Sequence, residues 1–166
     1  MTYLSSNQLK QYEDKGFVSP IDIFSKDKAK EIRNEIEFIE KEMPGELEKS
    51  GRYNAHLISP LLDEVTHNSE ILDAVQCLIG KDILVCGTTL FIKNPNVKGF
   101  VSYHQDAKYI GLEPHNWVTA WVAITDSNEH NGCMRVWSGS HKDNLKDHDQ
   151  KFNERNLLTR GQTIKN

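Results

Sequence analysis

His104 and Asp106 are separated by a single residue in the stretch FVSYHQD at 100–106. Because side chains at positions i and i+2 of a strand project to the same face, the imidazole and the carboxylate should point together, with Gln105 on the opposite side. Such a pair can form two corners of a 2-His-1-carboxylate facial triad, which holds Fe(II) and leaves coordination positions open. The same tripeptide also occurs as a solvated pair without metal, and so short a motif does not decide between the two interpretations.

The elements that must position this pair begin with a helical scaffold at 1–80. Capping residues, apolar residues at steps of three and four, and terminating glycines predict three helices. They run from Ser5 or Ser6 to Gly16, from Ser25 to Pro44-Gly45, and from Ser69 to Gly80. We assign no chemistry to these helices.

From residue 82 the pattern changes to β-branched and aromatic runs, which predict strands. The predicted strands are 82–95, 100–106, 116–125 and 133–137. Helices followed by strands indicate an α+β domain with a mostly antiparallel sheet, and 143–166 form a polar tail. Because open sheet edges are avoided, either a second chain in a homo-oligomer covers these edges or the barrel is incomplete in this chain.

Bulk composition limits the function. A chain of 166 residues predicts one domain over 1–166, and a net charge of −4 argues against nucleic-acid binding. No apolar run is long enough to cross a membrane. The three cysteines are odd in number and lack a CxxC pair, so they suggest neither a disulfide framework nor a zinc ribbon. A reducing, cytoplasmic location is expected.

Several further motifs accompany the HQD triplet over residues 82–142. They are Tyr109, the VTAWVAI strand with Trp121, the NGC turn at 131–133 and the GSHK segment at 139–142. In this order and spacing, the chain resembles the phytanoyl-CoA hydroxylase-like family of Fe(II)/2-oxoglutarate dioxygenases, and LSSNQLKQYEDKGFV resembles that family's opening helix. The resemblance implies a double-stranded β-helix, or jelly roll, which here lacks its C-terminal strands.

The resemblance also implies a set of site residues. His104 and Asp106 match the first two iron ligands, with Fe(II) as metal and 2-oxoglutarate as co-substrate. Leu90 and Trp121 match positions that line the 2-oxoglutarate pocket, and Gln105 lies between the ligands. Plain core packing is the alternative for Leu90 and Trp121.

The family's distal histidine ligand and its 2-oxoglutarate-binding arginine are not matched. His141 belongs to the GSHK segment, and His148 with Arg160 has a suitable spacing but lies in the polar tail, before the strand that should carry the ligand. We therefore expect residues 1–166 alone to hold Fe(II) weakly and not to turn over 2-oxoglutarate. The tail after Lys142 is predicted to be poorly ordered or packed against another chain.

The expected substrate rests on two segments, RYNAHL at 52–57 and SYHQDAKYIGLEP at 102–114. Both resemble the branch that hydroxylates aminoalkylphosphonates, and Arg52, Asn54 and Lys108 could donate to a phosphonate. Asn54 and His56 could equally close a loop, and a lipid acyl or amino-acid-like substrate is an alternative. Halogenating relatives carry Ala or Gly at the position of Asp106, so a carboxylate there favours hydroxylation.

Two other classes of function compete with this interpretation. One is a truncated, non-catalytic relative that serves as a binding or interaction domain. The other is an enzyme that uses the HxD pair for a non-redox metal such as zinc.

Overall fold

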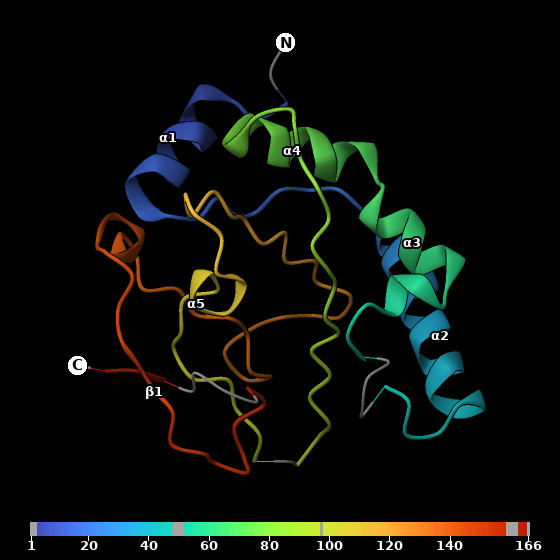
Figure 1. Cartoon of the computed structure of the whole chain (residues 1–166). Helices are drawn as coiled ribbons and strands as arrows, with labels where there is room; N and C mark the ends of the chain where they lie inside the picture. The colour runs from blue at the N-terminus through green and yellow to red at the C-terminus, as the bar shows by residue number, and fades with distance from the viewer. Residues whose placement is uncertain (1–2, 48–51, 97, 159–162, 166) are drawn as a thin grey trace.

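A computed structural model describes residues 3–47, 52–96, 98–158 and 163–165. The N-terminal half is helical, and Figure 1 shows its helices along one border of the molecule, with α1 beside α4 and α2 beside α3. Its elements are α1 (Ser6–Lys15), α2 (Lys26–Glu42), the 3-10 helix η2 (Ala55–Leu57), α3 (Pro60–Thr66) and α4 (Ser69–Ile79). The C-terminal half holds α5 (Ala107–Ile110), the 3-10 helix η3 (Ser140–Lys142), β1 (His148–Asp149) and β2 (Thr163–Ile164).

The three predicted helices are confirmed, and their ends follow from the capping residues. Ser5 and Gln8 form a capping box, in which the Ser5 hydroxyl accepts from the Gln8 amide and the Gln8 side chain accepts from the Ser5 amide. Gly16 ends α1 in the left-handed conformation at φ 81°. Ser25 caps α2, and Asn68, one residue before the predicted start, caps α4.

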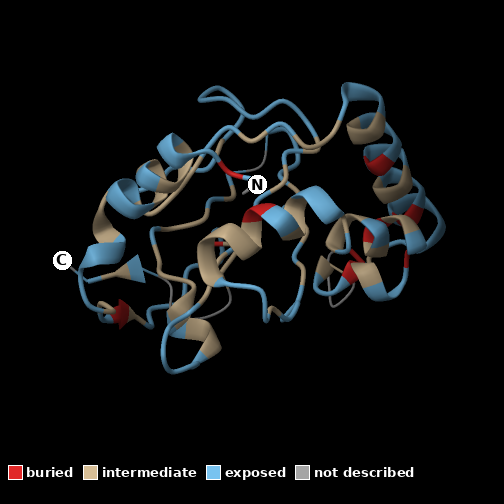
Figure 2. Ribbon diagram, turned by 90° about the horizontal axis from the view of Figure 1, so that it is seen from above, coloured by how far each residue is buried: buried red, intermediate tan, exposed pale blue. Residues whose placement is uncertain are grey.

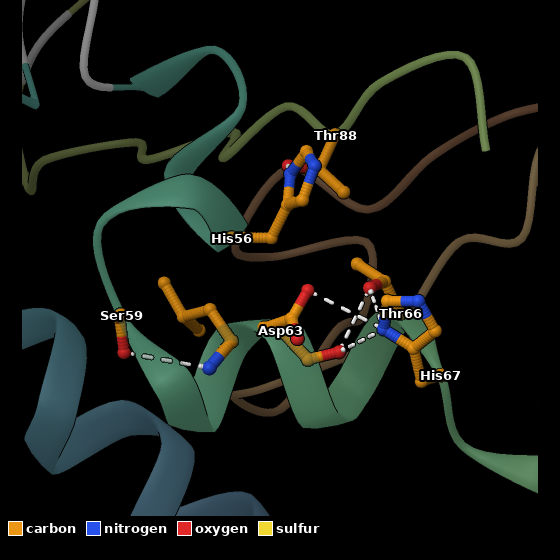
Figure 3. Close-up of polar contacts among 7 residues, drawn as sticks. His56, Ser59, Asp63, Thr66, His67 and Thr88 are labelled. Atoms are coloured by element: carbon orange, nitrogen blue, oxygen red, sulfur yellow. Dashed lines mark hydrogen bonds and ion pairs between the residues drawn. The ribbon is translucent and has the colours of Figure 1, made fainter.

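Helix α3 was not predicted, and a cap at each end accounts for it (Figure 3). At the start, the Ser59 hydroxyl accepts from the Leu62 amide at 3.4 Å and donates to Glu35 of α2 at 2.6 Å. At the end, the His67 ring nitrogen Nδ1 lies 3.0 Å from the Asp63 carbonyl and can donate to it. The helix is too short to show a clear apolar period, so the signals in the sequence were its capping residues and Pro60 at its first position.

The hydrophobic core lies within the helical half. Its buried residues are Ile32, Ile39, Leu47, Ala55 and Leu62. Figure 2 shows the buried positions concentrated at this end, with mostly intermediate and exposed positions elsewhere. Partly buried Leu90, Ile92 and Ile124 pack against it, so the segments predicted as strands reach the helices through apolar side chains.

The pairing predicted among the four strand segments is not seen in the described residues. These segments carry only two isolated bridges, Tyr53 with Thr89 and Phe100 with Asn156. Figure 1 draws them as irregular paths. The segments 82–95 and 100–106 bridge and hydrogen-bond instead to residues 52–54 and to the tail, while the backbone bonds of 116–125 and 133–137 are to nearby residues. The jelly roll stays a prediction.

The expectation of a poorly ordered tail is wrong for its described residues, which pair within this chain, whereas packing of the tail on another chain stays a prediction. β1 and β2 pair antiparallel, with His148 opposite Ile164. The tail also hydrogen-bonds along the segment before the HQD triplet: Phe100 donates to Arg155 at 2.9 Å, and Ile164 donates to the Tyr103 carbonyl at 3.1 Å. Backbone groups along 100–105 need partners, and the polar tail of the same chain supplies them.

Two compositional expectations can also be compared with the structure. All three cysteines are free, as expected. None of the helices in the described ranges has the length and apolar character needed to cross a membrane.

Candidate metal centre

The side-chain heads of His104 and Asp106 lie together. His104 Nε2 is 3.1 Å from Asp106 Oδ1, which confirms the predicted convergence. The two side chains do not converge along a regular strand, because Asp106 has helical backbone angles and is the N-cap residue of α5. The His104 side chain is 20 % exposed and that of Asp106 is 44 % exposed, so the pair is accessible from one side.

The tautomer of His104 follows from its other ring nitrogen. Nδ1 lies 2.8 Å from the Ser102 carbonyl oxygen, which can only accept, so Nδ1 carries a hydrogen. The neutral ring therefore presents the lone pair of Nε2 to a carboxylate oxygen. This contact is favourable only with a proton or another cation between the two atoms. A carbonyl that fixes the tautomer in this way is a common outer partner of metal-binding histidines.

The pKa values of the pair move in the directions expected for a proton shared between them. Burial lowers the pKa of His104, but the hydrogen bonds with Asp106 and Ser102 outweigh burial and raise it above its ordinary value. The hydrogen bond from His104 holds the pKa of Asp106 below its ordinary value, against the effect of burial. Both shifts favour a proton between the imidazole and the carboxylate, and a metal cation would take the place of that proton.

Asp106 is oriented through its second oxygen. The Thr119 hydroxyl donates to Asp106 Oδ2 at 2.5 Å and accepts from the Trp117 indole nitrogen at 3.3 Å. Oδ1 is thereby left facing His104. Sequence reasoning missed Thr119 and Trp117, although their alternation in the predicted strand at 116–125 put them on one face. The strand pattern could not show which side chain this face would meet.

The pair fits two ligands of one metal ion. Nitrogen and oxygen ligands bind first-row metals at about 2.1 Å, so neighbouring octahedral ligands are about 3.0 Å apart, close to the observed separation. Across the described part of the chain, no group of three or more His, Cys, Asp and Glu side chains could hold a metal. The described residues therefore fit two corners of a facial triad.

His148 is not available as the third ligand in this arrangement. Its side chain is buried, Nδ1 donates to the Lys146 carbonyl at 2.9 Å, and Nε2 accepts from the Gln105 amide at 2.9 Å. Arg160, which has a suitable spacing from His148 in the sequence, lies outside the described residues. His141 is engaged elsewhere, since its Nε2 lies 3.0 Å from the carbonyl oxygen of Glu13 in α1.

The residues matched to the 2-oxoglutarate pocket are placed differently from one another. Leu90 packs against the helical core, as the packing alternative has it, and Trp121 is 44 % exposed. The Gln105 side-chain oxygen accepts from the amide of Lys146, a residue of the tail, at 2.7 Å. Their roles toward 2-oxoglutarate stay predictions.

Thr119→Val tests the hydrogen bond to Asp106 with little change in shape. We expect metal affinity to fall about tenfold, the low end for loss of an outer partner of a ligand, because Asp106 is then free to rotate. The affinity is measured by titrating Co(II) and following the signals of residues 103–107 by NMR. Thr125→Val, an exposed threonine in the same segment, serves as control. Equal affinities in the two variants would contradict the expectation.

The sequence was compared with known proteins. A model of the family described as phytanoyl-CoA dioxygenase matches residues 12–164. The chain belongs to the phytanoyl-CoA dioxygenase family. It is 30 % identical over 169 residues to the peroxisomal phytanoyl-CoA dioxygenase of Rattus norvegicus, with 88 % of this chain and 50 % of the rat protein covered.

Other family members match over shorter stretches. The peroxisomal enzyme of Homo sapiens is 37 % identical over 84 residues, covering 48 % of this chain and 25 % of the human protein. A phytanoyl-CoA dioxygenase of Arabidopsis thaliana is 30 % identical over 90 residues, covering 54 % of this chain and 32 % of its own length. This chain thus spans half or less of the length of these relatives. No solved structure matches it.

Proposed function

We propose that this protein is an Fe(II)- and 2-oxoglutarate-dependent dioxygenase that hydroxylates a C–H bond of a small molecule. The observation that carries the proposal is the 3.1 Å convergence of His104 Nε2 and Asp106 Oδ1 in a chain of this family. When bound, Fe(II) and 2-oxoglutarate supply the oxidation: one atom of O₂ enters the C–H bond, and the other converts 2-oxoglutarate to succinate and CO₂.

The chain's own residues would hold the metal and orient its ligands. His104 and Asp106 would bind the metal, Ser102 fixes the ring of His104, and Thr119 fixes the carboxylate. The Tyr109 ring stands edge-on to His104 with centroids 5.7 Å apart, which limits the directions in which the imidazole can turn. Retention of a carboxylate at 106 supports hydroxylation over halogenation.

An oxyanion-bearing substrate, with an aminoalkylphosphonate as first candidate, is supported by Arg52. Its Nε and Nη2 atoms are buried and have no hydrogen-bond partner among the described residues. The guanidinium contacts the rings of Tyr53 and Phe91, at 5.5 and 5.7 Å from their centroids. Because buried guanidinium nitrogens without hydrogen-bond partners are costly, an anion that pairs with them gains affinity, and a phosphonate or carboxylate matches the guanidinium fork.

The other two candidate donors receive less support. Asn54 closes a loop: its side-chain oxygen accepts from the Thr88 amide at 3.2 Å, and its amide donates to the Thr88 carbonyl at 2.8 Å. His56 contacts the same residue through the Thr88 hydroxyl at 2.8 Å, as Figure 3 shows. Lys108 is exposed on α5, two residues after Asp106. These contacts support the loop-closing alternative for Asn54.

The proposal is tested by succinate release from 2-oxoglutarate with Fe(II). The natural protein, purified anaerobically and with its intact mass recorded, is given aminoalkylphosphonates, the matching alkylamines without phosphonate, amino acids and a phytanoyl-CoA thioester. We expect succinate with a phosphonate and little with the matching alkylamine. Activity with the thioester alone would overturn the substrate class and leave the reaction class standing.

The same preparation separates the competing functions. Metal analysis that finds zinc and no iron, with no succinate from any substrate, would favour a non-redox metal enzyme. Lack of both metal binding and succinate would favour a binding or interaction domain.

Arg52→Met tests the anion partner. We expect phosphonate affinity to fall at least about tenfold, while the free energy of unfolding stays equal or rises, because an unpaired buried charge is replaced by an apolar side chain of similar length. Binding is measured by calorimetry and stability by urea unfolding. Arg33→Met, on the exposed face of α2, is the control. A large loss of stability in Arg52→Met would show instead that Arg52 serves the fold.

A further inference from the structure

Buried polar side chains are concentrated where the tail meets residues 102–106, the segment that carries His104 and Asp106. The structure describes three such residues, Ser59, His148 and Asn156, and the last two belong to the tail. Asn156 donates to the Ser102 hydroxyl at 2.8 Å, and His148 accepts from the Gln105 amide at 2.9 Å. Polar groups are seldom buried unless each hydrogen bond is made, so these contacts define the local structure closely.

Lys146 and His148 hold Gln105 on two sides. The Gln105 side-chain oxygen accepts from the Lys146 amide at 2.7 Å, and the Gln105 amide donates to His148 Nε2. The His148 ring is itself fixed, since Nδ1 donates to the Lys146 carbonyl at 2.9 Å. That carbonyl fixes the hydrogen on Nδ1, and the lone pair of Nε2 is therefore directed at the Gln105 amide.

Gln105 is the residue that joins the two ligands. Its N–H belongs to the peptide between His104 and Gln105, so a bond to this N–H fixes the plane from which the His104 side chain projects. Rotation of that plane would swing His104 relative to Asp106 and lengthen the 3.1 Å separation. A site with two described donors depends strongly on such outer contacts for its geometry.

We propose that His148 is a positioning residue for the metal centre: by accepting the Gln105 N–H it sets the geometry of the His104–Asp106 pair. The inference rests on the proposed function, because it concerns the same metal site. The polar tail is then the outer support of the metal ligands, and His148 supports the site without touching the metal.

Two neutral substitutions separate this role from a general role in folding the tail. In His148→Gln the amide oxygen reaches about as far as Nε2 and can still accept from the Gln105 N–H. In His148→Asn the amide nitrogen replaces Nδ1 and can still donate to the Lys146 carbonyl, but nothing reaches Gln105. A positioning role therefore favours His148→Gln, and a purely structural role in the 146–148 turn favours His148→Asn.

The hydrogen bond and the metal site are both measured by NMR on the full chain. In the wild type we expect a scalar coupling across the hydrogen bond between the Gln105 nitrogen and His148 Nε2. Titration with Co(II) alone, followed through residues 103–107, should give an affinity within about threefold of wild type for His148→Gln and about 10- to 100-fold weaker for His148→Asn. Urea unfolding of both variants checks that each is folded.

The outcomes distinguish this inference from the proposed function. Equal Co(II) affinities for the two variants, or a weaker one for His148→Gln, would overturn the positioning role while His104→Ala still abolishes binding. Wild-type binding that is insensitive to His104→Ala, or no Co(II) binding by the wild type, would overturn the metal site itself and the inference with it.

Discussion

Replacement of Asp106 by alanine is expected to lower Co(II) and Fe(II) affinity at least about a hundredfold, beyond the effect of losing an outer partner. The reason is that one of two described donors disappears, and the remaining imidazole loses the anionic partner that lies 3.1 Å away. The measurement is the Co(II) titration by NMR, with anaerobic Fe(II) calorimetry as a second method. Asp22→Ala, an exposed carboxylate outside the helices, is the control.

The same variant tests the reaction class. With Asp106 gone we expect uncoupled turnover of 2-oxoglutarate to be abolished in any active, full-length form of the protein. Halogenating relatives carry Ala or Gly at this position, so chloride-dependent products from the variant would support the family's chemistry. Near wild-type turnover would contradict the assignment of Asp106 as a ligand.

The convergence of His104 and Asp106 and the helices could be predicted because both depend on local sequence. The separation of His104 and Asp106 by one residue required only that both side chains leave the chain on one side. The predicted helices carry their own caps, such as Ser5 and Ser25, so short stretches of sequence specify them. Helix α3 escaped because seven residues show no period.

The supports of the site could not be predicted because they come from distant parts of the chain. Thr119 meets Asp106 across 13 positions, and His148 meets Gln105 across 43. A polar tail is read from composition as solvated, yet His148 and Asn156 are buried there with their hydrogen bonds made. Composition describes the average of a segment, whereas burial depends on which partners the fold brings to each side chain.

The GSHK segment gains a structural role from its contacts with α1. Gly139 donates to the Lys15 carbonyl at 2.9 Å, and the His141 ring nitrogen Nε2 lies 3.0 Å from the Glu13 carbonyl. The last carbonyls of a helix lack partners within it, so the segment completes the end of α1. Gly16, the residue that ends α1, packs against this segment: a Cβ at Gly16 would be 2.5 Å from His141 Nδ1.

Gly16→Ala is therefore expected to destabilise the protein by about 2–5 kcal/mol. About 1–2 kcal/mol comes from placing alanine at φ 81°, and about 1–3 kcal/mol from the contact with His141. The measurement is urea unfolding. Gly111→Ala isolates the backbone part, because Gly111 has φ 67° with nothing within 4 Å of an added Cβ.

A double-mutant cycle then assigns the remainder to His141. In the His141→Ala background the ring is absent, so Gly16→Ala should cost only the backbone part, about 1–2 kcal/mol. The coupling energy measures how firmly the segment that follows the last predicted strand is held to the first helix. If Gly16→Ala costs the same with and without the ring, His141 moves aside freely, and the segment is held to α1 by contacts that do not need the ring, such as the Gly139 bond to Lys15 and the ion pair of Lys142 with Asp14.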